Sequence, residues 1–290
     1  ASSAAKPISD EDFLRCENGG FITDRGTSVL LRGINLNDDL FYFSKPDIDS
    51  SAKSYDVFYA LENRFGNYGA RQLVQKYNEG FISPSDIKFI SKLGANCVRI
   101  PLRYRYLCKK ENCKDNIDFE RLDFLIEKCR KAGLYVILDL HSAPGFQNTD
   151  SACGSNDKSI LFDSSKDAFE ARNSVIRLWT QVAAHYKNEP TVAAYDLLNR
   201  PLNRIADWDL KLDTLHKFYR RIYKAIRHID SRHIIIMQTA GTPDSLPAEN
   251  ALENVAYGFY SHFRTTYETD ALINCVRSYK SNGIPCIVCK

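Results

Sequence analysis

The stretch FISPSDIKFISKLGANCVRIPLRY, residues 81–104, decides the fold because it holds one complete helix-to-strand unit. Ser83 or Ser85 can cap a helix over 83–94, in which apolar side chains recur at helical spacing until a glycine ends it. The run ANCVRIPL at 95–102 then predicts a strand. A helix that leads directly into a buried strand is the repeating unit of α/β proteins.

The same alternation extends along the chain on both sides of this unit. Further helices are predicted at 118–133, 168–188, 209–230 and 269–283. Further strands are predicted at 28–36, 134–142, 191–201, 233–239, 255–263 and 284–289, and the longest irregular stretches at 37–70 and 143–167. The strands are almost continuously apolar, which suits parallel strands covered on both faces.

This order predicts a single α/β domain over residues 1–290. The order fits a β/α barrel, with seven strands evident in the sequence. A doubly wound sheet is the alternative, but no glycine-rich phosphate loop follows the first strand, which weakens it.

Composition limits the class of protein. Of the 290 residues, 44% are hydrophobic and 26% are charged, as in ordinary soluble globular proteins. The net charge of +3 is small for this length, so we expect no nucleic-acid partner. No apolar run is long enough to predict a transmembrane segment, and the residue patterns predict neither a cofactor nor a metal site.

The nine cysteines are a high count for this length. Cys108 and Cys113 flank the polar loop CKKENC and are placed to close a short disulfide. We expect the cysteines in apolar segments to be small core residues, namely Cys97, Cys129, Cys286 and Cys289. The compartment is left open, with a slight preference for a secreted protein.

Several motifs, in the correct order, resemble glycoside hydrolase family 5, and most of all its exo-β-1,3-glucanase-like branch. LRGINL resembles the signature of the first strand, VILDLHSAPGFQN that of the third strand, and YDLLNRP that of the fourth. The resemblance covers roughly residues 14–290. It implies a (β/α)8 barrel, a β-glucan-like carbohydrate ligand, and a binding site that includes Arg99, His141 and Asn199.

The resemblance also implies two catalytic glutamates, one in Asn-Glu-Pro after the fourth strand and one, the nucleophile, after the seventh. Here Arg200 stands at the first position, and IPCIVCK aligns Lys290 with the second. The sixth-strand motif would place its substrate-binding pair at Tyr260 and His262. A guanidinium keeps its proton near neutrality, and a protonated lysine has no lone pair with which to attack a sugar.

Our leading hypothesis is therefore a catalytically inactive pseudoenzyme with a structural, assembly or carbohydrate-binding role, so that enzyme status is uncertain. One alternative is an active retaining β-glucanase whose carboxylates lie elsewhere, and Glu189 and Glu268 are the nearest spare glutamates. Another is a module that binds anionic glycans through the two new cations. The pocket can relieve the repulsion between those cations in four ways: by splaying the side chains, by binding an anion, by pairing them with acids such as Asp139 or Asp196, or by deprotonating Lys290.

A barrel of this kind needs an eighth strand, and the sequence ends at Lys290 just after the seventh. We consider three explanations: a longer chain, processing after this residue, or a partner protein that completes the barrel or an assembly by adding a strand. The sequence names neither the ligand nor the assembly state.

Overall fold

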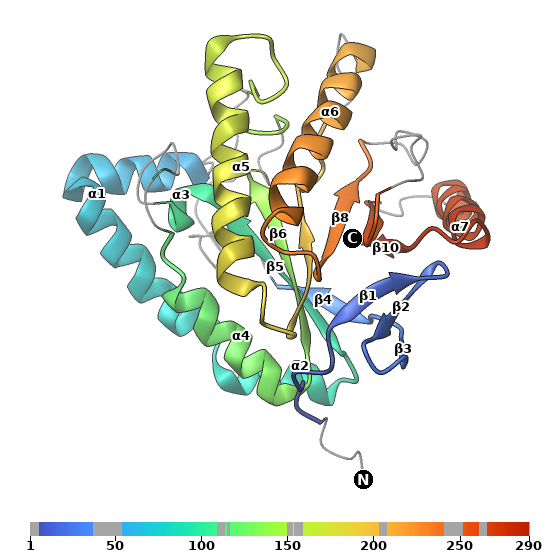
Figure 1. Ribbon diagram of the computed structural model, residues 1–290. Helices are drawn as coiled ribbons and strands as arrows, with labels where there is room; N and C mark the ends of the chain where they lie inside the picture. The colour runs from blue at the N-terminus through green and yellow to red at the C-terminus, as the bar shows by residue number, and fades with distance from the viewer. Residues whose placement is uncertain are drawn as a thin grey trace.

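Seven parallel strands form one curled sheet in the computed structural model (Figure 1), in the order β10-β9-β8-β7-β6-β5-β4. The structure describes residues 6–36, 54–108, 114, 117–149, 153, 159–202, 208–240, 252–260 and 266–289. The strands are β4 (Gly33–Asn35), β5 (Cys97–Arg103), β6 (Tyr135–Ser142), β7 (Val192–Asp196), β8 (Ile234–Gln238), β9 (Val255–Phe259) and β10 (Cys286–Val288). Each strand pairs with the next in the chain, which is the winding of a β/α barrel and confirms the predicted fold class.

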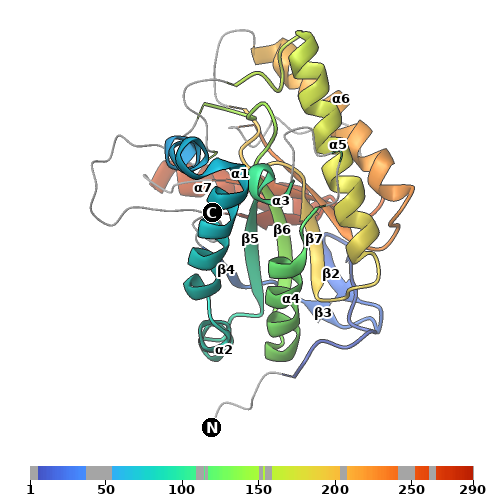
Figure 2. The same cartoon turned by 90° about the vertical axis from the view of Figure 1, so that its left-hand side faces the viewer.

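Helices follow most of the strands and cover the outer face of the curled sheet (Figures 1 and 2). They are α1 (Ser54–Phe81), α2 (Pro84–Lys92), α3 (Tyr104–Leu107), α4 (Glu120–Ala132), α5 (Lys166–Tyr186), α6 (Trp208–Arg227) and α7 (Thr266–Ser281). Ser83 caps α2 in a capping box with Asp86, as the sequence predicted. Gly133 ends α4 in the left-handed conformation, at φ 68°.

The chain before β5 differs most from the prediction. Residues 37–70 were expected to be irregular, but the part from Ser54 onward belongs to α1, which is kinked at Gly66. The single strand predicted at 28–36 is two strands in different sheets. The second of them begins at Gly33, where a Cβ atom would lie 2.1 Å from the Cys97 carbonyl oxygen, so that only glycine fits.

A small antiparallel sheet lies at the N-terminal end of the large one (Figure 1) and consists of β1 (Leu14–Glu17), β2 (Gly20–Thr23) and β3 (Ser28–Val29). Leu14 and Phe21 are buried in one cluster with Ile137, Ala194 and Ile236, which come from the interior face of the large sheet. The small sheet therefore plugs one end of the curled sheet and leaves the carboxyl end for a site.

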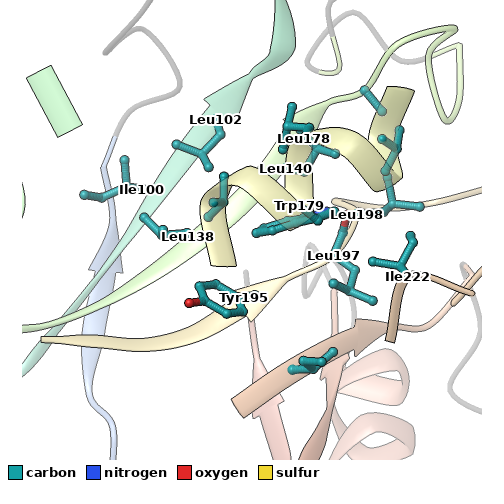
Figure 3. Packing of buried hydrophobic residues seen from close by; sticks show 14 of the residues in the cluster. Ile100, Leu102, Leu138, Leu140, Leu178, Trp179, Tyr195, Leu197, Leu198 and Ile222 are labelled. Atoms are coloured by element: carbon teal, nitrogen blue, oxygen red, sulfur yellow. Dashed lines mark hydrogen bonds between the residues drawn. The ribbon is translucent and has the colours of Figure 1, made fainter. Parts of the chain in front are cut away.

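The main core lies between the outer face of the large sheet and helices α5 and α6 (Figure 3). Trp179 of α5 is fully buried and packs beside Tyr195, with ring centroids 5.7 Å apart. Its indole N–H donates to the Leu197 carbonyl oxygen at 3.1 Å. This bond fixes the segment that leaves β7 and leads to Asn199 and Arg200.

Two further sequence predictions bear on the fold. Cys97, Cys129 and Cys289 are buried free thiols, as expected of small core residues, whereas Cys286 is only half-buried. Cys113 lies outside the described residues, so its bridge to Cys108 stays a prediction, as does the single domain. Among the described helices, none is long and apolar enough to cross a membrane.

Candidate functional site

Polar side chains gather on the interior face of the sheet, at its carboxyl end. Successive residues of a strand point to opposite faces, so residues two apart share one face. The interior positions that continue from the plugged core are Arg99, Asp139, His141, Asp196 and Gln238. Asp139 of β6 pairs directly with Asp196 of β7, which brings two carboxylates side by side.

Arg99 is the centre of this polar cluster. Its Nε donates to Asp196 Oδ2 at 2.9 Å, and its Nη2 lies 2.8 Å from Asp139 Oδ1. It also donates to the side-chain oxygens of Asn35, at 3.2 Å, and Asn199, at 3.1 Å. One guanidinium thus holds groups from β4, β6 and β7 and from the turn after β7 in fixed positions.

The cluster also reaches the last strand of the sheet. Asn35 Nδ2 donates to the Cys289 carbonyl oxygen at 2.7 Å, which links the turn after β10 to β4. The Cys289 thiol lies 3.9 Å from Asp196 Oδ2. The first and last strands of the curled sheet are therefore joined through side chains at this end.

Among the residues that the structure describes, the charges inside the cluster do not balance. Asp139 and Asp196 are both 0% exposed, and they share the single guanidinium of Arg99. Burial raises the pKa of Asp196 to about 7; Arg99 opposes this rise and the neighbouring Asp139 adds to it. The other oxygen of Asp196, Oδ1, is buried and has no hydrogen-bond partner among the described residues. An excess carboxylate is thus kept close to protonation near neutral pH.

His141 lies beside the cluster and is only half-buried. Its Nδ1 is 2.6 Å from Asp139 Oδ2, and its Nε2 is 3.3 Å from Asn199 Nδ2. Because Asn199 uses its oxygen to accept from Arg99, its amide nitrogen faces the histidine as a donor. The imidazole therefore accepts at Nε2 and donates from Nδ1 to Asp139.

Arg200 lies in the turn after β7, in a strained backbone conformation. Its φ is 48°, in the left-handed region that arginine rarely adopts. Its N–H donates to Gln238 Oε1 at 3.0 Å, and its carbonyl accepts from Asn148 Nδ2 at 2.6 Å. The guanidinium carbon lies 4.3 Å from the ring centroid of Tyr260, which is a cation–π contact.

Gln238 connects the two arginines of the site. Its Nε2 donates to Asp196 Oδ2 at 2.7 Å while its Oε1 accepts from the Arg200 backbone. Sequence reasoning missed this residue, although it occupies an interior position of the predicted strand 233–239. The alternation of that strand was the signal that could have found it.

The structure brings most of the predicted site residues together. Asn199 contacts both Arg99 and His141, and Tyr260 lies beside Arg200. His262 and Lys290 lie outside the described residues. Asp139 and Asp196, the acids considered as partners for the new cations, both pair with Arg99. The roles of all these residues stay predictions.

The site offers little to a metal ion. Within the part of the chain that the structure describes, no group of three or more His, Cys, Asp or Glu side chains is placed to hold one. Both interior carboxylates are already taken up by Arg99.

A curled parallel sheet with helices outside it, plugged at one end and polar at the other, places the chain among the TIM-barrel proteins. The family model for cellulase, glycosyl hydrolase family 5, matches residues 59–289. A β-xylosidase from Phanerodontia chrysosporium is 30% identical over 260 residues, which are 86% of this chain and 52% of that protein. The chain therefore belongs to glycoside hydrolase family 5.

Other relatives agree with this family. A glucan 1,3-beta-glucosidase from Schwanniomyces occidentalis is 28% identical over 207 residues, 69% of this chain and 46% of that protein. The chain spans about half the length of the curated relatives that it matches.

Solved structures show the fold alone. An endogalactoceramidase superposes with a TM-score of 0.67 at 18% identity, over 94% of this chain and 66% of that one. The endoglucanase Cel5A of Thermotoga maritima superposes with a TM-score of 0.53 at 21% identity, over 71% and 70%.

Proposed function

We propose that this family 5 barrel has lost glycoside hydrolysis and retains a carbohydrate-binding cleft at the carboxyl end of its sheet. The observation that carries the proposal is Arg200, a cation at the position where the family resemblance expects the proton donor. A general acid must release a proton to the leaving oxygen and later take one from water, which a guanidinium does not do near neutrality.

The neighbours of Arg200 hold both its backbone and its side chain in place. Both backbone hydrogen-bonding groups of the residue are used, one by Gln238 and one by Asn148. The guanidinium rests on Tyr260. A positive charge held here would oppose the positive charge that develops on the sugar during glycosidic cleavage.

An active β-glucanase with relocated carboxylates is the other candidate, and Asp196 is its best acid. A pKa raised to about 7 is what a general acid needs at neutral pH. However, Asp196 is 0% exposed, and its Oδ2 is engaged by both Arg99 and Gln238. A carboxyl group that is enclosed in this way is out of reach of a glycosidic oxygen.

The active β-glucanase hypothesis could also use one of the two spare glutamates, so their places in the fold matter. Glu189 precedes β7 at the N-terminal end, where its carboxylate lies 3.4 Å from Arg130 and its backbone carbonyl lies 3.1 Å from His233 Nε2. Glu189 is thus at the wrong end of the sheet, because barrel enzymes place their chemistry at the carboxyl ends of the strands. Glu268 lies in the first turn of α7, the helix that follows β9.

A retained binding cleft is supported by the polar groups that survive at the carboxyl end. His141 is half-buried and Asn199 is held by Arg99, so both are pre-positioned. The curated relatives named above act on xylosides and β-1,3-glucans, by their names. A neutral β-linked oligosaccharide is therefore the first ligand to test.

The stacked cation favours a second ligand class, an anionic glycan. Arg200 is half-buried beside Tyr260, so a sugar carboxylate could reach its guanidinium while the ring contacts apolar surface. Such binding would weaken as salt is added and would be lost in Arg200→Gln. Binding of a neutral oligosaccharide would survive both changes.

The experiment measures turnover and binding on the full-length protein. We expect no release of product from an aryl β-glucoside, an aryl β-xyloside or a β-1,3-glucan above the rate in buffer. We expect a β-1,3-gluco-oligosaccharide to bind to the wild type and to bind more weakly to His141→Ala. The control variant His228→Ala, which changes an exposed histidine on the outside of the barrel, should bind like the wild type.

Turnover that persists in Arg200→Ala would overturn the loss of hydrolysis. Failure of every neutral and anionic oligosaccharide to bind would overturn the binding role and favour a structural or assembly role, including a partner that adds a strand.

A further inference from the structure

Helix α6 carries a concentrated run of positive charge on its C-terminal half. Residues 216–228 read HKFYRRIYKAIRH, with five lysines and arginines, two histidines and no acid. The small net charge of the whole chain hides this run. The expectation of no nucleic-acid partner rested on that net charge and did not take the run into account. The run is a surface feature on the outside of the barrel, away from the polar cluster around Arg99.

Part of this run forms a straight stripe on the exposed face of the helix. Lys217, Arg221, Lys224 and His228 follow one another at intervals of four, three and four residues, which is the spacing of one helical face. All four are exposed. They extend over roughly 16 Å, given a rise of about 1.5 Å per residue. We call these four residues the cationic stripe.

The opposite face of α6 fixes the stripe toward solvent. Phe218, Tyr219, Ile222 and Ile226 are buried in the main core. The Tyr219 hydroxyl donates to the Gln238 carbonyl oxygen at 3.1 Å, which ties the helix to β8. The helix therefore cannot rotate its charged face inward without loss of this core.

Little negative charge compensates the stripe within the described part of the chain. Lys217 pairs with Asp213 one turn earlier, at 2.6 Å, but Arg221 and Lys224 form no ion pair with any described residue. Glu253 lies nearby through its backbone carbonyl, which accepts from Tyr223. Arg221 also donates to Asn173 Oδ1, an uncharged partner, at 3.1 Å. The charges of Arg221 and Lys224 are thus not neutralised by any described acid.

Helix α5 adds a further cation and an aromatic ring beside the stripe (Figures 1 and 2 show the two helices packed together). Burial, and then the nearby charge of Arg221, lower the pKa of Arg172. Phe169 is 49% exposed, and the Arg221 guanidinium lies 5.8 Å from its ring centroid. An exposed aromatic ring next to cations can stack on a sugar ring while the cations bind its acidic groups.

We propose that the cationic stripe binds an anionic polysaccharide that carries sulfate or carboxylate groups, with Phe169 as a stacking surface. Charge complementarity requires a polyanion, since the stripe concentrates like charges with little compensation. This surface lies outside the carbohydrate cleft, and the proposal does not depend on what that cleft binds.

Two other polyanions fit the surface less well. Single-stranded nucleic acids are held by several aromatic rings along a groove, and the aromatics of the run itself are buried or engaged by the backbone. Binding to an anionic membrane needs several apolar side chains that insert beside the charges. No large exposed apolar residue lies between Lys217 and His228, and Phe169 beside Arg221 supplies a single ring.

The test measures binding of the full-length protein to heparin, polygalacturonate and neutral dextran, at low and at physiological salt. We expect heparin or polygalacturonate to bind, dextran not to bind, and added salt to weaken the complex. The double variant Arg221→Gln/Lys224→Gln should bind roughly tenfold more weakly. Each cation that contacts a dense polyanion releases a bound counterion, and the variant loses this contribution at two positions. The matched double variant Lys88→Gln/Lys131→Gln removes two exposed charges from α2 and α4 and should bind like the wild type.

Three results would overturn the proposal: no binding of either polyanion at low salt, equal loss in the control variant, or no loss in the stripe variant. Tighter, stripe-dependent binding to a single-stranded oligonucleotide or to phosphatidylserine vesicles would also overturn it. Thermal melting of each variant confirms that it is folded. Arg200→Gln tests the cleft separately: loss of polyanion binding in this variant, with no loss in the stripe variant, would assign the binding to the cleft and overturn the proposal.

Discussion

The two ends of the large sheet each bury an aspartate, and they differ in how the charge is held. At the N-terminal end, Asp230 accepts from the Tyr195 hydroxyl at 2.8 Å and lies 2.6 Å from His233 Nδ1. Burial opposes its charge, but hydrogen bonds and the charge of His233 outweigh burial and lower its pKa to about 2. This carboxylate is fully provided with partners.

At the carboxyl end, Asp196 shares one guanidinium with Asp139, and one of its oxygens finds no hydrogen-bond partner in the part of the chain that the structure describes. Its pKa rises to about 7, mainly through burial. The buried charge at the plugged end is therefore stabilised by its partners. The open end instead keeps an unbalanced charge, as functional sites often do. Four predictions test this contrast, and they run from the largest expected effect to the smallest.

Arg99→Ala should have the largest effect, because it removes the guanidinium that two buried carboxylates share. We expect the free energy of unfolding to fall by about 3–5 kcal/mol. Urea denaturation measures this, with Arg15→Ala as the control, since Arg15 forms only exposed ion pairs whose loss costs about 1 kcal/mol or less. Equal losses in the two variants would show that the cluster is not the electrostatic centre of the fold.

The pH dependence of stability should differ between the two ends. The folded pKa of Asp196 lies above the value of 3.8 that it has when unfolded, so the folded state binds more protons between pH 4 and 7. Its contribution therefore favours folding at low pH and is lost as the pH rises through about 7. The free energy of unfolding of Asp196→Asn minus that of the wild type should therefore increase between pH 5 and pH 8, by an amount on the order of a few kcal/mol.

Denaturation curves at several pH values check this shift. A constant difference between wild type and Asp196→Asn over that range would contradict the raised pKa.

Asp230→Asn should destabilise the protein by a smaller amount that does not vary with pH over the same range. The variant weakens the bonds to Tyr195 and His233, which we expect to cost about 1–3 kcal/mol. Because the pKa of Asp230 is about 2, its charge and its contribution are complete well below neutral pH and are lost only as the pH falls toward 2. A pH-dependent loss between 5 and 8 would remove the contrast between the two ends.

Substitution of Arg200 should have the smallest effect on stability. In Arg200→Gly, relief of the left-handed backbone, about 1 kcal/mol, should offset the lost contact with Tyr260, about 0.5–1 kcal/mol. Arg200→Ala loses the contact without that relief and should be less stable than the glycine variant by about 1 kcal/mol. Thermal melting of the two variants side by side measures the difference. A glycine variant less stable than the alanine variant would contradict the strained backbone.

Much of the fold follows from the sequence because the buried strands carry strong local signals. The helix and strand of residues 81–104 are both present, and the motifs place Arg99, His141 and Asn199 together. The small sheet at 14–29 was missed because strands of two to four residues leave little periodicity. The N-terminal part of α1 was missed because its hydrophobic pattern is weak and Gly66 breaks it.

The partners of the buried charges could not be predicted in the same way. Asp139 and Asp196 lie on separate strands, and their pairing with Arg99 depends on the stagger of three neighbouring strands. The cationic stripe on α6 was missed for another reason, since a charge averaged over 290 residues conceals a local run.

The central claim is that glycosidic cleavage is lost at a site that still has the family architecture. Its most direct test mixes the full-length protein with a β-1,3-gluco-oligosaccharide at equal concentrations and follows the sugar by mass spectrometry over many hours. The account predicts an oligosaccharide of unchanged length and no covalent sugar on the protein. Shortened products that accumulate faster than in buffer, and equally fast with Arg200→Ala, would contradict it.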